Sequence, residues 1–109
     1  MKMEPYSYMI RIPEDIPTYY PCGSGYGILY KDQPMFIERR DYTEDRWAVI
    51  SMGSCLNKES MQFVYERIPS SRDEEFISNH RFTLEEAKKA VENLFAFWRT
   101  EGVNEIPKK

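Results

Sequence analysis

Four consecutive apolar residues at positions 47–50, Trp-Ala-Val-Ile, constrain the fold more than any other feature of this sequence. A short strand carries such a run when both of its faces are covered, whereas a half-buried strand alternates. A later segment does alternate, with Met61, Phe63 and Tyr65 on one face. The residues between them, 53–60, are too many for a two-residue turn and favour a longer hairpin loop. We therefore expect an antiparallel hairpin with one strand near the centre of a sheet.

A long helix is predicted after this hairpin. Thr83 and Glu86 have the spacing of a capping box, and Gly102 is expected to end the helix in a left-handed conformation. The side chains that share one stripe at the helical period are apolar: Leu84, Ala87, Val91, Leu94, Phe95 and Trp98. Such a stripe must be covered, and a sheet face is the expected partner. A shorter helix should precede this one, capped by Ser70 or Ser71.

The first half of the sequence predicts more irregular strands. Residues 6–12 alternate and indicate a half-buried strand. Prolines followed by alternating glycines predict a mobile or tightly turned loop over 19–27. Residues 28–30 and 35–38 are expected to pair around a Lys-Asp-Gln-Pro turn. The fold class is then α+β, an antiparallel sheet of four or five strands with one long C-terminal helix packed on one face, in a single domain over 1–109.

Charge and hydropathy exclude several classes of protein. The formal net charge of -3 argues against a protein that binds nucleic acid directly through its phosphates. No stretch reaches the ~20 apolar residues of a membrane span, and the N-terminus lacks the apolar segment of a signal peptide. We therefore expect a cytoplasmic protein with no membrane partner. Cys22 and Cys55 should be reduced thiols there, and a disulfide between them would form only in an oxidising compartment.

The Gly-rich segment is the strongest candidate for a ligand site. Gly23, Ser24 and Gly25 could present backbone amides to an anion. The segment matches neither the dinucleotide-binding fingerprint nor the phosphate-binding P-loop, and the preceding prolines do not fit a strand-loop-helix setting. Glycine clusters commonly mark a turn and nothing more. A small-ligand or nucleotide-binding function through residues 23–27 is therefore the alternative hypothesis.

No combination of residues indicates catalysis, a cofactor or a metal site. His80 is the only histidine, so a triad would depend on it alone, and nearby Ser70 and Ser71 are explained by capping. Cys22, Cys55 and His80 lack the short ligand spacings of structural zinc sites. We therefore expect a protein that is not an enzyme and has no cofactor.

Exposed aromatic side chains are the best candidates for binding a partner. Tyr19, Tyr20 and Tyr26 lie in the proline- and glycine-rich segment, and Phe97 lies roughly 120° from the centre of the helical stripe. Tyrosine offers a large contact area at low entropic cost, which suits recognition. Packing of these tyrosines over a small sheet is an equally good interpretation. Arginines such as Arg46 could form a basic patch, but pairing with neighbouring acidic residues is the favoured interpretation.

Residues 46–87 resemble a pattern found in short uncharacterised bacterial and phage-encoded proteins. The residues that carry the resemblance are Trp47-Ala48-Val49, Leu56-Asn57, Tyr65-Glu66, Pro69-Ser70-Ser71-Arg72, Phe76 and Arg81-Phe82, before a Glu-Glu-Ala helix start. The resemblance implies a small cytosolic accessory protein, and it brings no known active site.

These observations favour a non-enzymatic protein-binding module. The resemblance suggests an accessory protein of a phage or mobile element that acts on a host protein complex as an inhibitor. Residues 1–45 carry 5 basic and 8 acidic side chains, so the expected partner is a basic or nucleic-acid-handling host protein. The sequence leaves the oligomeric state open.

Overall fold

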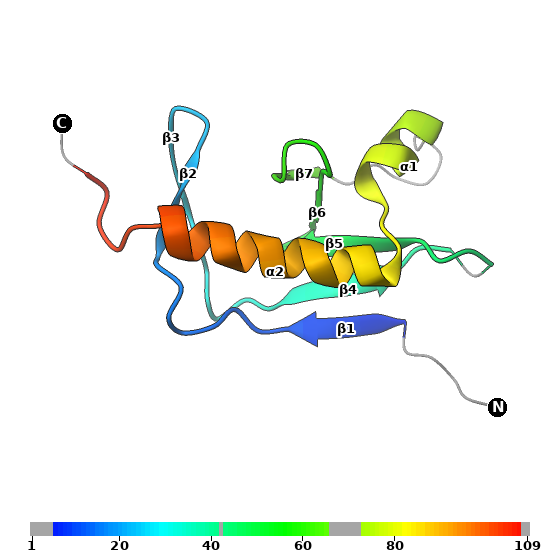
Figure 1. Cartoon of the computed structure of the whole chain (residues 1–109), viewed down its shortest axis with the longest axis horizontal. Helices are drawn as coiled ribbons and strands as arrows, with labels where there is room; N and C mark the ends of the chain where they lie inside the picture. Colours follow the sequence, from blue (N-terminus) through cyan, green and yellow to red (C-terminus); the bar gives the residue numbers. More distant parts are fainter. Residues whose placement is uncertain (1–5, 42, 66–72, 108–109) are drawn as a thin grey trace.

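The computed structural model describes residues 6–41, 43–65 and 73–107. Seven strands precede two helices in this part of the chain (Figure 1). The strands are β1 (Ser7–Ile10), β2 (Tyr19–Cys22), β3 (Gly25–Ile28), β4 (Met35–Arg39), β5 (Trp47–Ser51), β6 (Ser54–Leu56) and β7 (Phe63–Tyr65). The helices are α1 (Glu74–His80) and α2 (Leu84–Glu101).

Five of the strands form one antiparallel sheet in the order β1-β4-β5-β6-β7, and β2 and β3 form a separate two-stranded sheet. Helix α2 packs on one face of the larger sheet, as Figure 1 shows. The predicted α+β fold, an antiparallel sheet of four or five strands with the long helix on one face, is therefore confirmed, and the sheet has five strands. The central position of β5 is also confirmed, because all four residues of the run at 47–50 are buried.

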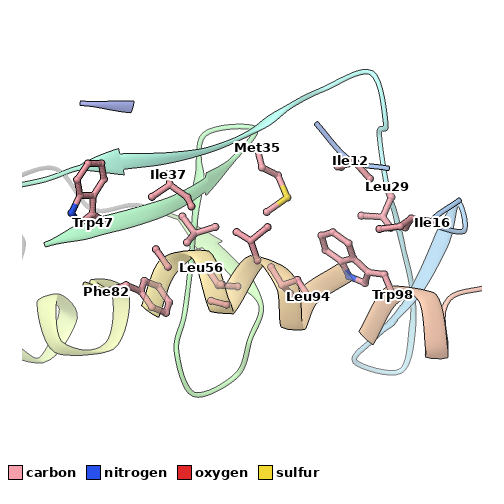
Figure 2. Packing of buried hydrophobic residues seen from close by; sticks show 14 residues of the cluster. Ile12, Ile16, Leu29, Met35, Ile37, Trp47, Leu56, Phe82, Leu94 and Trp98 are labelled. Atoms are coloured by element: carbon pink, nitrogen blue, oxygen red, sulfur yellow. The ribbon is translucent and has the colours of Figure 1, made fainter. Parts of the chain in front are cut away.

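The main core lies between the sheet and α2 (Figure 2). Its buried side chains come from the strands, the connecting segments and the helix: Ile12, Ile16, Leu29, Met35, Ile37, Trp47, Val49, Leu56, Phe82, Ala87, Ala90, Val91, Leu94 and Trp98. The predicted helical stripe is confirmed, with Leu84 and Phe95 at its partly buried margins. Phe97 lies outside the stripe and is exposed, as its angular position predicted.

The opposite face of the sheet has a smaller apolar cluster. Ala48, Ile50 and Cys55 are buried there against Phe76 of α1. Asp73 caps this short helix by accepting a hydrogen bond from the amide of Phe76 at 2.8 Å. The serines predicted to cap it, at 70 and 71, lie outside the described residues.

Both ends of α2 are held by the chain around it. The predicted capping box is present, since the Thr83 side chain accepts from the Glu86 amide and the Glu86 side chain accepts from the Thr83 amide. At the other end, the prediction of a left-handed Gly102 was wrong, because Gly102 has φ -72° and ψ 157°. Glycine is required there by close approach: an added Cβ would collide with the carbonyl oxygen of Trp98 and lie 3.0 Å from that of Tyr19.

The predicted hairpin with a loop over 53–60 was wrong, because those residues contain β6, which lies between β5 and β7 and pairs with both. Met52 and Gly53 form a two-residue turn with φ values of 50° and 82°, the pattern of a type I′ hairpin. Asparagine rather than methionine is the usual first residue of that turn, which is why the sequence did not reveal it.

Two predictions for the N-terminal half were also wrong. Residues 19–27 were expected to form a loop without strand pairing, and they contain the β2–β3 hairpin. The hydrogen bond from the Leu29 amide to the Thr18 carbonyl makes these residues a hydrogen-bonded pair, and it thereby fixes which positions along the ladder are hydrogen-bonded. It places Pro21 opposite Tyr26 at a non-hydrogen-bonded position, where no amide is needed. Residues 28–30 and 35–38 do not pair with each other, since β4 lies between β1 and β5.

We expect Trp98→Ala to lower the free energy of unfolding by about 3–5 kcal/mol, because the side chain is a large, buried aromatic. Trp98 is 3% exposed, whereas the neighbouring Phe97 is 42% exposed. Phe97→Ala is therefore the matched control and should cost much less. Urea denaturation followed by circular dichroism measures both. Equal losses in the two variants would contradict the burial of Trp98.

We expect Met52→Asn to raise the stability by about 1 kcal/mol, because asparagine tolerates the left-handed conformation better than methionine does. Met52 is 63% exposed, so little burial is lost. Met9→Asn is the control, since Met9 is an exposed methionine in a strand. A gain in melting temperature for Met52→Asn but not for Met9→Asn is the expected result, and no gain at position 52 would contradict it.

Candidate functional site

An open apolar groove lies between the β2–β3 hairpin, the C-terminal half of α2 and the segment 60–63. Its volume is about 350 Å³. The residues that line it are all uncharged: Tyr20, Pro21, Cys22, Ser60, Met61, Gln62, Phe63, Asn93, Leu94, Phe97 and Trp98. The groove lies at the junction between the hairpin and the larger sheet, where two separately hydrogen-bonded units meet.

Tyr20 forms the hairpin side of the groove. Its ring centroid lies 5.8 Å from that of Trp98, and the two rings are tilted by 48°. Gly27 lies directly across the ladder from Tyr20, and an added Cβ there would come within 2.6 Å of the Tyr20 ring. The glycine therefore provides the space that the ring occupies. Burial raises the pKa of the Tyr20 phenol above its ordinary value, with a smaller contribution from Cys22, so the groove has no phenolate at neutral pH.

Asn57 shapes the opposite wall of the groove. Its side-chain oxygen accepts hydrogen bonds from the amides of Glu59 and Ser60, at 2.9 and 3.0 Å. Its carbonyl accepts from the Met61 amide at 2.9 Å, and Met61 has a positive φ of 54°. The Asn57 side-chain amide then donates to Nε2 of His80 at 3.0 Å. These bonds fix a tight loop that directs Met61 toward the groove.

The four aromatic residues predicted to bind a partner are divided between two surfaces. Tyr20 and Phe97 come together at the groove. Tyr19 and Tyr26 lie on the other face of the hairpin, because side chains alternate along a strand and Tyr20 faces Trp98. Tyr26 is exposed and Tyr19 is partly buried. Sequence reasoning could not separate the two sets without the register of the hairpin.

Met61 and Phe63 are groove residues that sequence reasoning assigned only to a strand face. Phe63 lies at the start of β7, while Met61 belongs to the loop fixed by Asn57. An Asn followed by Lys-Glu-Ser is typical of a side-chain-stabilised turn, and this was the available signal for the loop.

The Gly-rich segment is the tight turn of the hairpin. Gly23 has a φ of 60° at the first position of a two-residue turn, followed by Ser24. Gly25 begins β3, opposite Cys22 at a hydrogen-bonded position of the ladder. Its amide is directed toward Cys22 and is not available to cradle an anion.

His80 serves a structural role in the described part of the chain. Its Nδ1 lies 2.8 Å from the carbonyl oxygen of Phe76, which accepts from it, and Nε2 accepts from Asn57. Both ring nitrogens are therefore engaged. Cys22 and Cys55 are not joined in a disulfide; the first lies at the groove and the second is buried in the sheet. Among residues 6–41, 43–65 and 73–107, no group of three His, Cys, Asp or Glu side chains could hold a metal ion.

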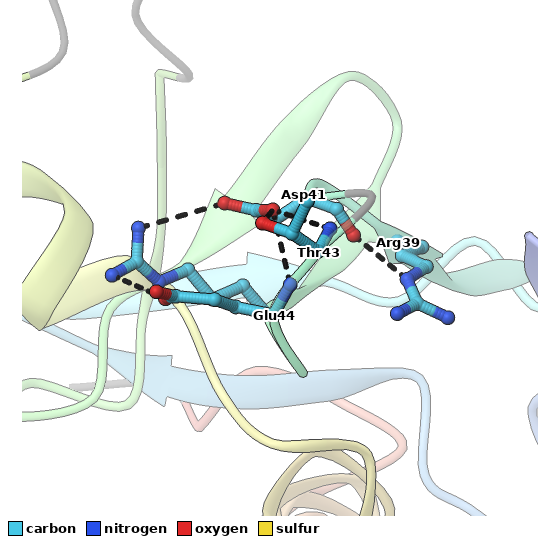
Figure 3. Close-up of polar contacts among 5 residues, drawn as sticks. Arg39, Asp41, Thr43 and Glu44 are labelled. Carbon is cyan, nitrogen blue, oxygen red and sulfur yellow. Dashed lines mark hydrogen bonds and ion pairs between the residues drawn. The ribbon is translucent and has the colours of Figure 1, made fainter.

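Arg40 and Arg46 pair with neighbouring acidic residues, as predicted, and the pairs of Arg46 lie at the β4–β5 connection (Figure 3). The Asp41 carboxylate accepts from the amide and hydroxyl of Thr43, at 2.8 and 2.9 Å, and from the Glu44 amide at 3.1 Å. Arg46 lies 3.7 Å from Asp41 and 2.6 Å from Glu44. Arg40 pairs with Glu38 at 2.9 Å.

Three carboxylates of the described chain are stabilised in their charged form. The Thr43 amide holds the pKa of Asp41 below its ordinary 3.8. The Arg99 side chain lowers the pKa of Asp15 below the same value. The Thr83 amide lowers the pKa of Glu86 below its ordinary 4.5. Each group therefore stabilises the fold above the pKa of its unfolded form, and this contribution is lost as the pH falls through its folded pKa.

We expect the free energy of unfolding to be level near neutral pH and to fall below about pH 4.5, where these carboxylates begin to bind protons in the unfolded chain. Urea titrations across the acid range measure this. Asp41→Asn should lower the stability at pH 7 and reduce the acid slope, whereas Asp32→Asn is the control on the exposed turn that follows Tyr30. An unchanged slope in Asp41→Asn would contradict the contribution of Asp41.

No known protein family, curated protein or solved structure shows a significant match to this chain. None of the described helices combines the length and apolar character that crossing a lipid bilayer requires.

Proposed function

We propose that this protein is a non-enzymatic protein-binding module and that its groove receives an apolar side chain of a partner protein. The observation that carries the proposal is an open, uncharged groove with an exposed aromatic side chain, Phe97, at its edge. Buried aromatic and aliphatic anchors in such pockets contribute most of the affinity of many protein interfaces.

The chemistry of the groove favours an apolar segment over a nucleotide. Ser60, Gln62 and Asn93 are the polar residues that line it, and no Lys or Arg is among the lining residues. The phosphates of a nucleotide would therefore meet no compensating charge in the groove. The alternative site on the Gly-rich turn has less support as well, because the Gly25 amide belongs to the hairpin ladder.

The groove is also well suited to presenting a rigid contact surface. The Tyr20 ring packs against Trp98 and over the backbone of Gly27. Asn57 fixes the loop that carries Met61. Preorganised side chains lose little conformational entropy on binding. The proposed partner is a basic or nucleic-acid-handling host protein, in keeping with the excess of acidic residues in the first 45 positions. The proposed effect is inhibition of the partner's complex.

We expect Phe97→Asp to abolish capture of the partner while leaving the fold intact. The measurement is affinity purification of the tagged protein from a bacterial lysate, with quantitative mass spectrometry of the captured proteins. Tyr65→Asp is the matched control, because Tyr65 is 76% exposed and does not line the groove. A stoichiometric protein that is lost with Phe97→Asp and retained with Tyr65→Asp supports the proposal.

Two outcomes would contradict it. Retention of the same protein by Phe97→Asp would place the interface elsewhere. A small apolar molecule that copurifies with the wild-type protein in native mass spectrometry, and is displaced by Phe97→Asp, would instead assign the groove to a ligand.

A further inference from the structure

The outer edge of β3 has no strand beside it in the described part of the chain. Thr18 and Leu29 form a hydrogen-bonded pair, so the alternation turns the amide and carbonyl of Gly27 toward Tyr20 of β2. The same alternation turns the backbone groups of Tyr26 and Ile28 away from β2. The corresponding outward position on β2 is already satisfied, since Tyr19 exchanges two hydrogen bonds with Val103, at 2.9 and 2.8 Å.

This edge lacks the protection that edge strands usually have. Residues 16–30 contain no charged side chain, although 30% of the chain is charged. At one outer edge of the larger sheet, Arg11 directly follows β1, whereas the charged residue nearest to β3 in the sequence is Lys31, three positions beyond that strand. Charged residues at edge strands prevent unwanted pairing with other chains. Because β3 carries no charged residue, nothing of this kind prevents its outer edge from pairing with another strand.

The exposed side chains of β3 are also apolar. Tyr26 is 39% exposed and Ile28 is 48% exposed, and both lie on the face of the hairpin opposite Tyr20. An aromatic residue opposite a β-branched residue is a favourable cross-strand pair. Gly27, which lies between them, has no side chain.

This arrangement is complementary to itself. A two-fold axis at Gly27 places each Tyr26 opposite the partner subunit's Ile28, with the backbone groups of both residues facing those of the neighbouring strand. Gly27 then meets the partner subunit's Gly27 at a non-hydrogen-bonded position, where the strands approach most closely and no side chains collide. Because the hairpin is uncharged, two copies of a chain with a net charge of -3 can meet here without opposing like charges.

We propose that two copies of this chain pair antiparallel through the outer edges of β3, and so join the two hairpins into one four-stranded sheet. The occupant of the edge is a second copy of the chain, in the register that sets Tyr26 against the partner subunit's Ile28. The proposal does not depend on the groove, whose hairpin residues all belong to β2.

Sedimentation velocity of the full chain, from micromolar to millimolar concentration, tests the proposal. The dimer fraction of the wild-type protein should rise with concentration. Ile28→Lys should weaken the dimer by more than about tenfold, because a lysine at the edge replaces the cross-strand contact with a charge facing the partner. Met9→Lys introduces the same charge at an exposed position of β1 and should leave the dimer unchanged.

Amide hydrogen exchange measured by nuclear magnetic resonance identifies the register. The amides of Tyr26 and Ile28 should be protected at concentrations where the dimer forms and should exchange freely after dilution. Tyr26→Lys replaces Ile28→Lys if circular dichroism shows that the latter does not fold. A wild-type protein that stays monomeric at every concentration would overturn the proposal. A dimer that persists in the folded lysine variant, or that leaves both amides unprotected, would overturn it equally.

Discussion

Trp47 joins the sheet to the long helix through its backbone and its side chain at the same time. Its amide and carbonyl exchange hydrogen bonds with Phe82, at 2.7 and 2.8 Å. Its indole nitrogen donates to Asp45 at 2.7 Å, and the same carboxylate oxygen accepts from the Leu84 amide at the first turn of α2. These hydrogen bonds fix the position and direction of the first turn of α2 relative to β5. The apolar stripe of α2 can cover the sheet in one orientation because its first turn is already fixed.

The far end of α2 holds the β2–β3 hairpin in a similar way. The described part of the hairpin shares no strand pairing with the five-stranded sheet. It is attached instead by the Tyr19–Val103 bridge just beyond the helix and by the contact of Tyr20 with Trp98. Arg99 adds a salt bridge to Asp15 at 2.7 Å, although an exposed pair contributes little stability. The helix therefore acts as the connection between the two sheets, and the groove occupies the space that this connection leaves beside it.

The parts of the fold that could be predicted were those specified by local pattern. The strand at 47–50 and the helical stripe were predicted correctly, because burial on both faces gives a continuous apolar run and a helix gives apolar residues at a period of 3.6. The turn at Met52 and the hairpin containing Pro21 were missed because their chemistry depends on context. Methionine rarely adopts a positive φ, and a proline is compatible with a ladder only where the register needs no amide.

The candidate site shows the same division. Phe97 could be identified because it departs from a regular stripe, which is again a local property. Tyr20 could not be separated from Tyr19 and Tyr26, since the face that each one occupies depends on the hairpin register. Met61 lines the groove because its loop is fixed by Asn57, and the Asn57 side chain is hydrogen-bonded to His80, 23 positions away in the sequence. Long-range contacts of this kind leave no periodic signal.

The Tyr19–Val103 bridge has a consequence for the order in which the protein matures on the ribosome. The hairpin is synthesised before β4 to β7, but its backbone anchor, Val103, is made only after both sheets and α2. During translation the hairpin can form locally, because its strands are adjacent in sequence, yet it has nothing to hold it in place. Neighbouring nascent chains on one messenger RNA would then display the same unanchored, uncharged strand. Crowding of ribosomes on one messenger RNA thus favours pairing between chains that are not yet complete.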